Sequence, residues 1–220
     1  YPEGKTDSTY TVPENVEAIK GHAFMSAKCS SIIIPDSVTT INNYAFEGCN
    51  YLSKINLPSN INSIGSQAFS GCSFKNITIP DQVKIISSGT FSNCKNLETV
   101  ILPNGLIGIG YGAFSGCTSL TSITLPDSIT ELAHDIFKGC SKLTSINIPK
   151  NLNKCTTNYS SYDSKTHAAF TDSNVTEVKI PKGMTKIPSN LFYNCTSIKD
   201  IELPDGIIAI ESMAFFSRHA

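Results

Sequence analysis

Eight cysteines are the residues of this 220-residue chain with the most varied chemistry, because a thiolate can act as a nucleophile or bind a metal, and two thiols can form a disulfide. Their even number admits a disulfide framework. Six of them lie three residues after a phenylalanine, at Cys49, Cys72, Cys94, Cys117, Cys140 and Cys195. No Cys-x-x-Cys or His-x-x-x-His pair offers two zinc ligands on one turn.

One stretch, residues 155–170, brings a cysteine, an aspartate and a histidine together as Cys155, Asp163 and His167. A cysteine nucleophile needs a base within hydrogen-bond reach of its thiol. The other residues of this stretch are polar and typical of a surface loop. The chain also has no Gly-rich phosphate loop, Gly-x-Ser-x-Gly elbow or paired-carboxylate motif. We therefore expect that the chain is not an enzyme, and keep this stretch as the catalytic alternative.

The spacing of the cysteines belongs to a repeat that runs through the whole chain. Nine prolines follow one another at 22 or 23 residues, apart from one interval of 32. A phenylalanine follows each proline after 11 residues, except Phe170, which lies 21 residues after Pro149. The period is therefore about 23 residues, with an insertion at about residues 156–167. The prolines that set the phase are Pro13, Pro35, Pro58, Pro80, Pro103, Pro126, Pro149, Pro181 and Pro204.

Each repeat predicts a short strand in front of its proline. Apolar residues stand three and one positions before it, as Ile123 and Leu125 do before Pro126. This alternation is typical of a strand with one buried face, and proline ends the strand because it cannot donate the next ladder bond. A turn and a second apolar pair follow, as at Ile129 and Leu132. The Ala-Phe-x-Gly-Cys segment then predicts about one helical turn, with glycine near its end.

All eight cysteines occupy apolar positions of this repeat. Cys29 stands where other repeats carry leucine or phenylalanine, and Cys155 stands where they carry isoleucine or leucine. We therefore interpret the cysteines as small buried hydrophobic residues. Side chains at one register in adjacent coils point the same way, which is poor geometry for a disulfide. We predict free thiols, and expect no metal site and no cofactor.

A single coil cannot bury its own apolar side but stacked coils can, which predicts a solenoid of about nine coils. Strands of successive coils should pair in parallel. The phenylalanine side of each coil is bulkier than the strand side. We therefore expect a curved array with a parallel β-sheet on the concave face, and short strands, turns and single helical turns on the convex side. Residues 1–220 should form a single domain, which we expect to be a fragment of a longer chain.

The repeating unit L-x-x-I-x-L-P-x-x-[IV]-x-x-I-x-x-x-A-F-x-G-C, clear in "AFSGCTSLTSITLPDSITEL" at residues 113–132, resembles the BspA-like class of leucine-rich repeats. The resemblance extends from about Tyr10 to Phe215. It implies a leucine-rich repeat solenoid in a surface-exposed or secreted protein that takes part in adhesion or binds host proteins. The sequence departs from the pattern at Phe24 and Phe170, which lack the following Gly-Cys, and at the insertion.

The strand face offers the residues that we expect to bind a partner, because solenoids commonly use such a face. Residues two and four positions before each proline point outward, and most are neutral and rich in hydroxyls. The candidates on the expected concave face are Lys54, Asn56, Asn76, Thr78, Thr99, Ile101, Ser122, Thr124, Ser145, Asn147, Glu177 and Lys179. Tyr159 and Tyr162 of the inserted loop are a second candidate site, because tyrosine among small polar residues suits recognition. The alternative is an ordinary tolerated loop insertion.

Composition narrows the class of partner. The net charge of −1 argues against nucleic acid, which needs a basic surface, and no apolar run approaches the length of a membrane span. We expect a monomeric, non-catalytic module at the cell surface or outside the cell. Its partner would be a host or matrix protein, or another cell-surface ligand. The alternative function is a structural spacer that presents another domain.

Overall fold

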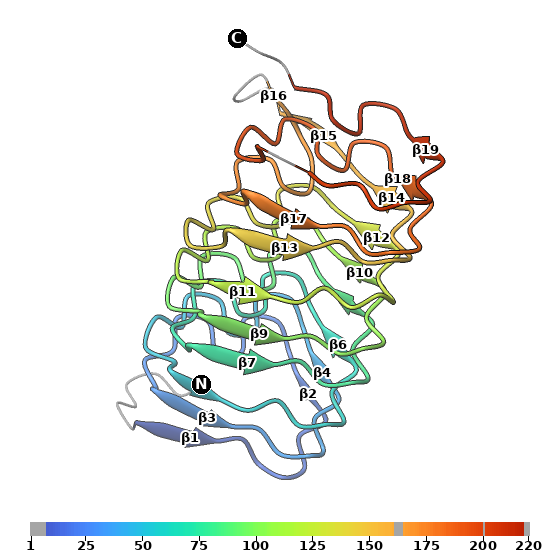
Figure 1. Cartoon of the computed structure of the whole chain (residues 1–220). Coiled ribbons are helices and arrows are strands. Elements are labelled where there is room, and N and C mark those ends of the chain that lie inside the picture. Colours follow the sequence, from blue (N-terminus) through green and yellow to red (C-terminus); the bar gives the residue numbers. More distant parts are fainter. Residues whose placement is uncertain (1–7, 161–164, 200, 218–220) are drawn as a thin grey trace.

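The computed structural model describes residues 8–160, 165–199 and 201–217. These residues form a stack of coils that rises from the N-terminal to the C-terminal end of the chain (Figure 1). Each regular coil supplies one short strand to a first ladder and another to a second ladder, and the strands of each ladder run parallel. The predicted parallel solenoid is therefore confirmed.

The first ladder consists of the strands that precede the prolines. Apolar residues pair at equivalent positions, as Ile77 does with Val100 and Ile146 with Val178, and these side chains are buried. The hydrogen-bonded pairing is interrupted between β5 and β7 and between β11 and β13. Within the described residues the first ladder has eight strands, β1 (Thr9–Thr11), β3 (Ser31–Ile33), β5 (Lys54–Ile55), β7 (Asn76–Thr78), β9 (Thr99–Ile101), β11 (Ser122–Ile123), β13 (Ser145–Asn147) and β17 (Glu177–Lys179).

The second ladder follows the turn after each proline. Its strands are β2 (Ala18–Ile19), β4 (Thr40–Ile41), β6 (Ser63–Ile64), β8 (Ile85–Ile86), β10 (Gly108–Ile109), β12 (Glu131–Leu132), β14 (Lys154–Cys155), β18 (Lys186–Ile187) and β19 (Ala209–Ile210). The ninth coil, around Pro204, supplies β19 but no first-ladder strand within the described residues. The molecule therefore has about eight complete turns where the repeat count predicts nine.

A column of phenylalanine rings runs through the core. The nine ladder phenylalanines stack from Phe24 to Phe215, with ring centroids 5.1 to 6.1 Å apart. The thiol of Cys117 donates to the carbonyl of Phe91 in the preceding coil at 3.1 Å, and four other ladder cysteines make the equivalent bond. Seven of the eight thiols are buried and Cys195 is half-buried, so the core positions predicted for the cysteines are confirmed.

The Ala-Phe-x-Gly-Cys segments do not form the predicted helical turns, and the described residues contain no helix. The backbone φ angle is positive both two residues before and two residues after the ladder phenylalanine, as at Tyr44 (60°) and Gly48 (71°) around Phe46. This alternation directs every second N–H along the stack. The N–H of Phe46 donates to the carbonyl of Ala68 in the next coil at 2.8 Å. A helix would keep these donors inside the coil, so the left-handed residues add a third row of bonds between coils.

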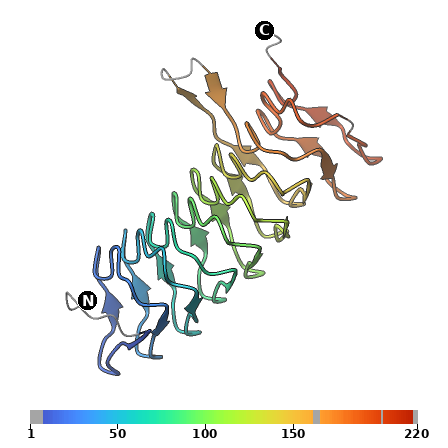
Figure 2. The same ribbon diagram turned by 90° about the vertical axis from the view of Figure 1, so that its left-hand side faces the viewer.

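The insertion forms an antiparallel hairpin of β15 (Asn158–Ser160) and β16 (Lys165–His167), which stands out from the stack (Figure 2). The first ladder and the phenylalanine column continue past it, whereas β14 and β18 of the second ladder do not pair. Strand β13 pairs directly with β17, and the rings of Phe137 and Phe170 lie 5.9 Å apart. The extra residues are therefore accommodated outside the regular coil.

Candidate binding surface

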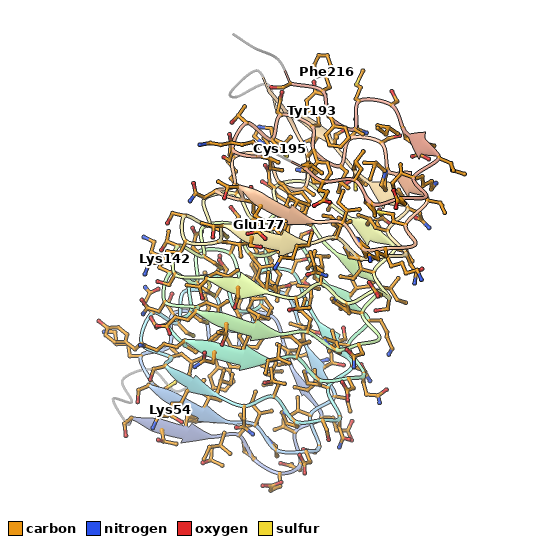
Figure 3. All side chains as sticks on the ribbon, viewed as in Figure 1. Lys54, Lys142, Glu177, Tyr193, Cys195 and Phe216 are labelled. Atoms are coloured by element: carbon orange, nitrogen blue, oxygen red, sulfur yellow. The ribbon has the colours of Figure 1, made fainter. Side chains whose placement is uncertain are left out.

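The outward side chains of the first ladder form one solvent-exposed surface, named here the first-ladder face. Lys54 and Glu177 mark two levels of this face (Figure 3). Ten of the twelve candidate residues on it are exposed, whereas Ser145 and Asn147 are half-buried. The alternation of inward and outward residues read from the sequence therefore describes the face correctly over most of its length.

Four of the candidate residues lie around one hollow of about 340 Å³. Thr99 and Ile101 belong to β9, while Ser122 lies on β11 and Thr124 just beyond it. Ile101 is 62% exposed. The hollow therefore combines three hydroxyl groups with one accessible apolar side chain, and no charged residue lines it.

Asn147 serves the fold. Its side-chain amide accepts a bond from the N–H of Leu125 at 2.9 Å and donates to the carbonyl of Leu125 at 2.7 Å. These bonds bridge β13 to the end of β11, where the first ladder is interrupted. Because both the oxygen and the nitrogen of this side-chain amide bond to the backbone, Asn147 is not a candidate contact for a partner.

The charged end of the face is partly neutralised within the chain. Glu177 and Lys179, two residues apart on β17, form an ion pair of 3.7 Å between exposed side chains. An exposed pair at this distance is weak, and a partner can replace it at little cost.

The inserted hairpin is fixed at its base by a buried polar cluster. His167 is 2% exposed, and its Nδ1 lies 2.6 Å from Oδ1 of Asp135. His134 Nδ1 lies 3.3 Å from the other carboxylate oxygen. The sequence interpretation missed Asp135, which stands two residues before Phe137 at a position where the backbone φ angle is positive (57°). This position holds tyrosine or glutamine in other coils, so the repeat gives no signal for the anchor. In the hairpin itself, Tyr159 pairs with Thr166 through the backbone.

Tyr162 and Asp163 lie in residues 161–164, outside the described part of the chain. The catalytic alternative therefore has to be judged from Cys155 and His167. Cys155 lies in β14 with its side chain in the core, and burial raises the pKa of its thiol to about 12. A thiol with such a pKa is protonated at neutral pH and is a poor nucleophile. The buried contact between His167 and Asp135 fixes the base of the hairpin, which is a structural role.

Further features bear on the class of site. The described ranges contain no group of three or more His, Cys, Asp and Glu side chains arranged to hold a metal ion. Across the same ranges, we find no helix with the length and apolarity that crossing a bilayer requires.

The stacked coils, the strand-and-turn unit and the phenylalanine column define a leucine-rich repeat protein. The model of the BspA type leucine rich repeat region matches residues 8–94, 62–166 and 163–219, in six copies. The chain therefore belongs to the BspA-type leucine-rich repeat family. Repeat proteins of this kind are generally non-catalytic scaffolds that offer an extended binding surface.

Solved structures agree with this assignment. A leucine-rich repeat protein from Bacteroides ovatus is 32% identical with a TM-score of 0.74, over 92% of this chain and 51% of that one. The leucine-rich repeat protein of T. pallidum is 25% identical with a TM-score of 0.64, over 89% of this chain and 80% of that one. The chain thus spans about half the length of the Bacteroides ovatus protein. Among curated proteins, none matches this chain.

Proposed function

We propose that this chain is a non-catalytic protein-binding module, secreted or carried at the cell surface, that binds host or extracellular-matrix proteins through its first-ladder face. The observation that carries the proposal is the hollow formed by Thr99, Ile101, Ser122 and Thr124 on an exposed and regular sheet. Membership of the BspA-type leucine-rich repeat family supports it, because such repeat arrays offer an extended surface to protein partners.

The chemistry of the hollow suits a protein partner. Interfaces gain most of their affinity from a few desolvated side chains, and Ile101 offers an exposed apolar anchor. The hydroxyls around it can donate and accept hydrogen bonds. Because no charged side chain lines the hollow, a partner can cover it without desolvating an ion.

The test is a binding assay with the purified chain immobilised and a panel of purified extracellular-matrix and epithelial surface proteins in solution. Ile101→Arg and Thr124→Arg should weaken binding at least about tenfold, because each buries a charge at the interface. The matched control is Ile85→Arg, which changes an isoleucine of similar exposure (58%) on β8 of the second ladder.

The outcomes separate the alternatives. Equal losses for Ile85→Arg and Ile101→Arg would contradict binding through the first-ladder face. A folded chain that captures none of the panel would contradict the binding function itself, and would favour the second candidate, a structural spacer.

A further inference from the structure

Some coils of the stack are one residue shorter at the rim of the first-ladder face. Most coils place two residues between the cysteine position and the next buried leucine, as Asn50 and Tyr51 do before Leu52. The third coil places only Ser73 before Phe74, which is buried in the place of leucine. The shortening therefore removes a rim residue and leaves the core position filled.

The short rim leaves a groove of about 830 Å³ between its longer neighbours. Tyr51 of the second coil and Asn96 of the fourth lie on either side of it. The groove opens onto β3, β5 and β7, at the place where the pairing of the first ladder is interrupted. Between them the lining includes Ile33, Asn50, Lys54, Asn56, Lys75 and Asn76.

Side-chain amides dominate the polar lining of the groove. Asn96 donates to the carbonyl of Ser73 at 3.5 Å, and Asn76 accepts a bond from the hydroxyl of Thr99, so each keeps one unused end. Within the part of the chain that the structure describes, the side-chain amides of Asn50 and Asn56 make no hydrogen bond to the protein. The groove therefore presents several donors and acceptors side by side.

Two further features complete the groove. The Tyr51 side chain is 64% exposed, so an apolar aromatic surface is available at its edge. No carboxylate lines the groove. Lys75 pairs with Glu98 at 3.1 Å, whereas Lys54 has no acidic partner among the described residues. Lys54 is therefore the cation that an acidic group of a ligand would meet.

We propose that this groove binds an oligosaccharide, with sugar hydroxyls bonded to the asparagine amides, one sugar ring against Tyr51 and an acidic sugar near Lys54. Sugar hydroxyls both donate and accept, as amides do, so the two sets of groups match. The C–H face of a pyranose ring is apolar and can cover an exposed aromatic ring. This activity goes beyond the proposed binding of proteins at Ile101, which lies on β9, the strand that follows β7 in the first ladder.

Other ligand classes fit the groove less well. A peptide would need apolar pockets for its anchor side chains, but Tyr51 and Ile33 are the exposed apolar residues in the lining. Nucleic acid requires several cations along its backbone, and the groove offers Lys54 and the already paired Lys75.

The experiment screens the labelled chain on an array of neutral and sialic-acid-containing oligosaccharides, followed by calorimetric titration of the oligosaccharides that bind. We expect acidic oligosaccharides to bind more tightly than their neutral counterparts. Tyr51→Ala should weaken binding of both at least about tenfold, and Lys54→Ala should remove the preference for the acidic ones. Thr124→Arg, just beyond β11 and separated from β7 by β9, should leave the sugar affinity unchanged, which separates this activity from the proposed protein binding.

A threonine inserted between Ser73 and Phe74 restores the two-residue rim and fills the groove without changing its floor. The matched control is a threonine inserted after Asn174, in another short coil. The first insertion should abolish sugar binding and the second should leave it intact, with both variants keeping the wild-type circular dichroism. Absence of binding to every oligosaccharide, or unchanged binding after the insertion at Ser73, would overturn the proposal.

Discussion

The middle coils and the last coil carry the same residue types at the same register, yet only the middle coils bury them. Phe114, Ile109 and Leu125 are at most 2% exposed. Their counterparts in the last coil, Phe215, Ile210 and Leu203, are 41%, 54% and 38% exposed. The repeat decides which side of a coil faces along the stack, but the burial of that side is supplied by the neighbouring coil. Stability in such an array is therefore mainly a property of the contacts between coils.

The largest effect that tests this comparison is the loss of one ring of the phenylalanine column. Phe114→Ala removes a ring stacked on both sides, at 5.6 and 5.8 Å, and should lower the free energy of unfolding by about 3–5 kcal/mol. Phe215→Ala should cost about 1 kcal/mol or less, because that ring is stacked on one side and partly solvated. Denaturant titration of both variants gives the two values, and equal losses would break the comparison.

Alkaline pH should destabilise the middle coils through their thiols. Burial raises the pKa of Cys94 and of Cys140 to about 12, from an ordinary value of 9.0. Below pH 9 the thiols are protonated in both the folded and the unfolded chain, so their titration does not lower the free energy of unfolding there. Between pH 9 and 12 only the folded chain keeps them, and the free energy of unfolding should fall by about 1.4 kcal/mol per pH unit for each thiol. In Cys94→Ala, the free energy of unfolding measured by denaturant titration should decline less steeply with pH across this range. An unchanged slope would contradict the contribution of the Cys94 thiol.

The coil that carries the hairpin contacts the preceding coil partly through a buried polar pair, His167 with Asp135. Asp135→Asn should lower the free energy of unfolding by about 1–3 kcal/mol, because it weakens a buried bond to His167. Glu131→Gln, which breaks an exposed ion pair with Lys154, should cost about 0–1 kcal/mol. Hydrogen exchange should show faster opening of β16 in the first variant only. Slow exchange of β16 in both variants would show that the anchor is dispensable.

Two glycines with positive φ angles, one in a middle coil and one in the last coil, allow the packing around the two coils to be compared. Alanine at either site is strained by roughly 1–2 kcal/mol, because φ is +74° at Gly116 and +97° at Gly206. At Gly116 the added Cβ would also come within 2.5 Å of Asn93 Oδ1 in the preceding coil, whereas at Gly206 it meets nothing within 4 Å. Gly116→Ala should therefore lower the thermal midpoint more than Gly206→Ala, and the reverse order would contradict the crowding.

The smallest effect concerns the ion pair that ties the last coil to the stack. Glu211 contacts Lys186 at 3.0 Å, and this hydrogen bond, followed by the one from the Ser189 N–H, lowers the pKa of the Glu211 carboxyl. A lowered pKa means that the contribution is present above pH 4.5 and is lost as the pH falls through the folded value. The protection of the β19 amides, relative to their intrinsic exchange rates at each pH, should fall in acid, and Glu211→Gln should remove most of that acid dependence. Identical pH dependence in both chains would exclude the pair as its source.

Several elements of the fold were correctly predicted from local patterns. The spacing of Phe114 and Cys117 from Pro103 places both in the core, and the 32-residue interval between prolines locates the hairpin. The helical turn was wrongly predicted because a glycine such as Gly116 signals a positive φ angle but does not tell a helix end from a turn that bonds to the next coil. The second left-handed position, two residues before the phenylalanine, is occupied by residues as different as tyrosine, glutamine and aspartate.

The candidate sites depended more strongly on tertiary structure. The sequence identified Thr99, Ile101, Ser122 and Thr124 as outward-facing, and coil stacking brought them around one hollow. It did not predict that the amide of Asn147 bonds to Leu125, that His167 meets Asp135, or that a missing rim residue beside Tyr51 opens a groove. These features depend on residues 22 or more positions apart.

By itself, the sequence determined the period, the inward and outward residues of each strand, the buried thiols and the site of the insertion. Each of these follows from the chemistry of one coil and from its repetition. Only the tertiary structure decided the turn geometry, the polar anchors and the shape of the grooves, because these depend on how a coil meets the next one. The repeat determines which residues of each coil face the neighbouring coils. Local differences between successive coils then produce the hollow and the groove.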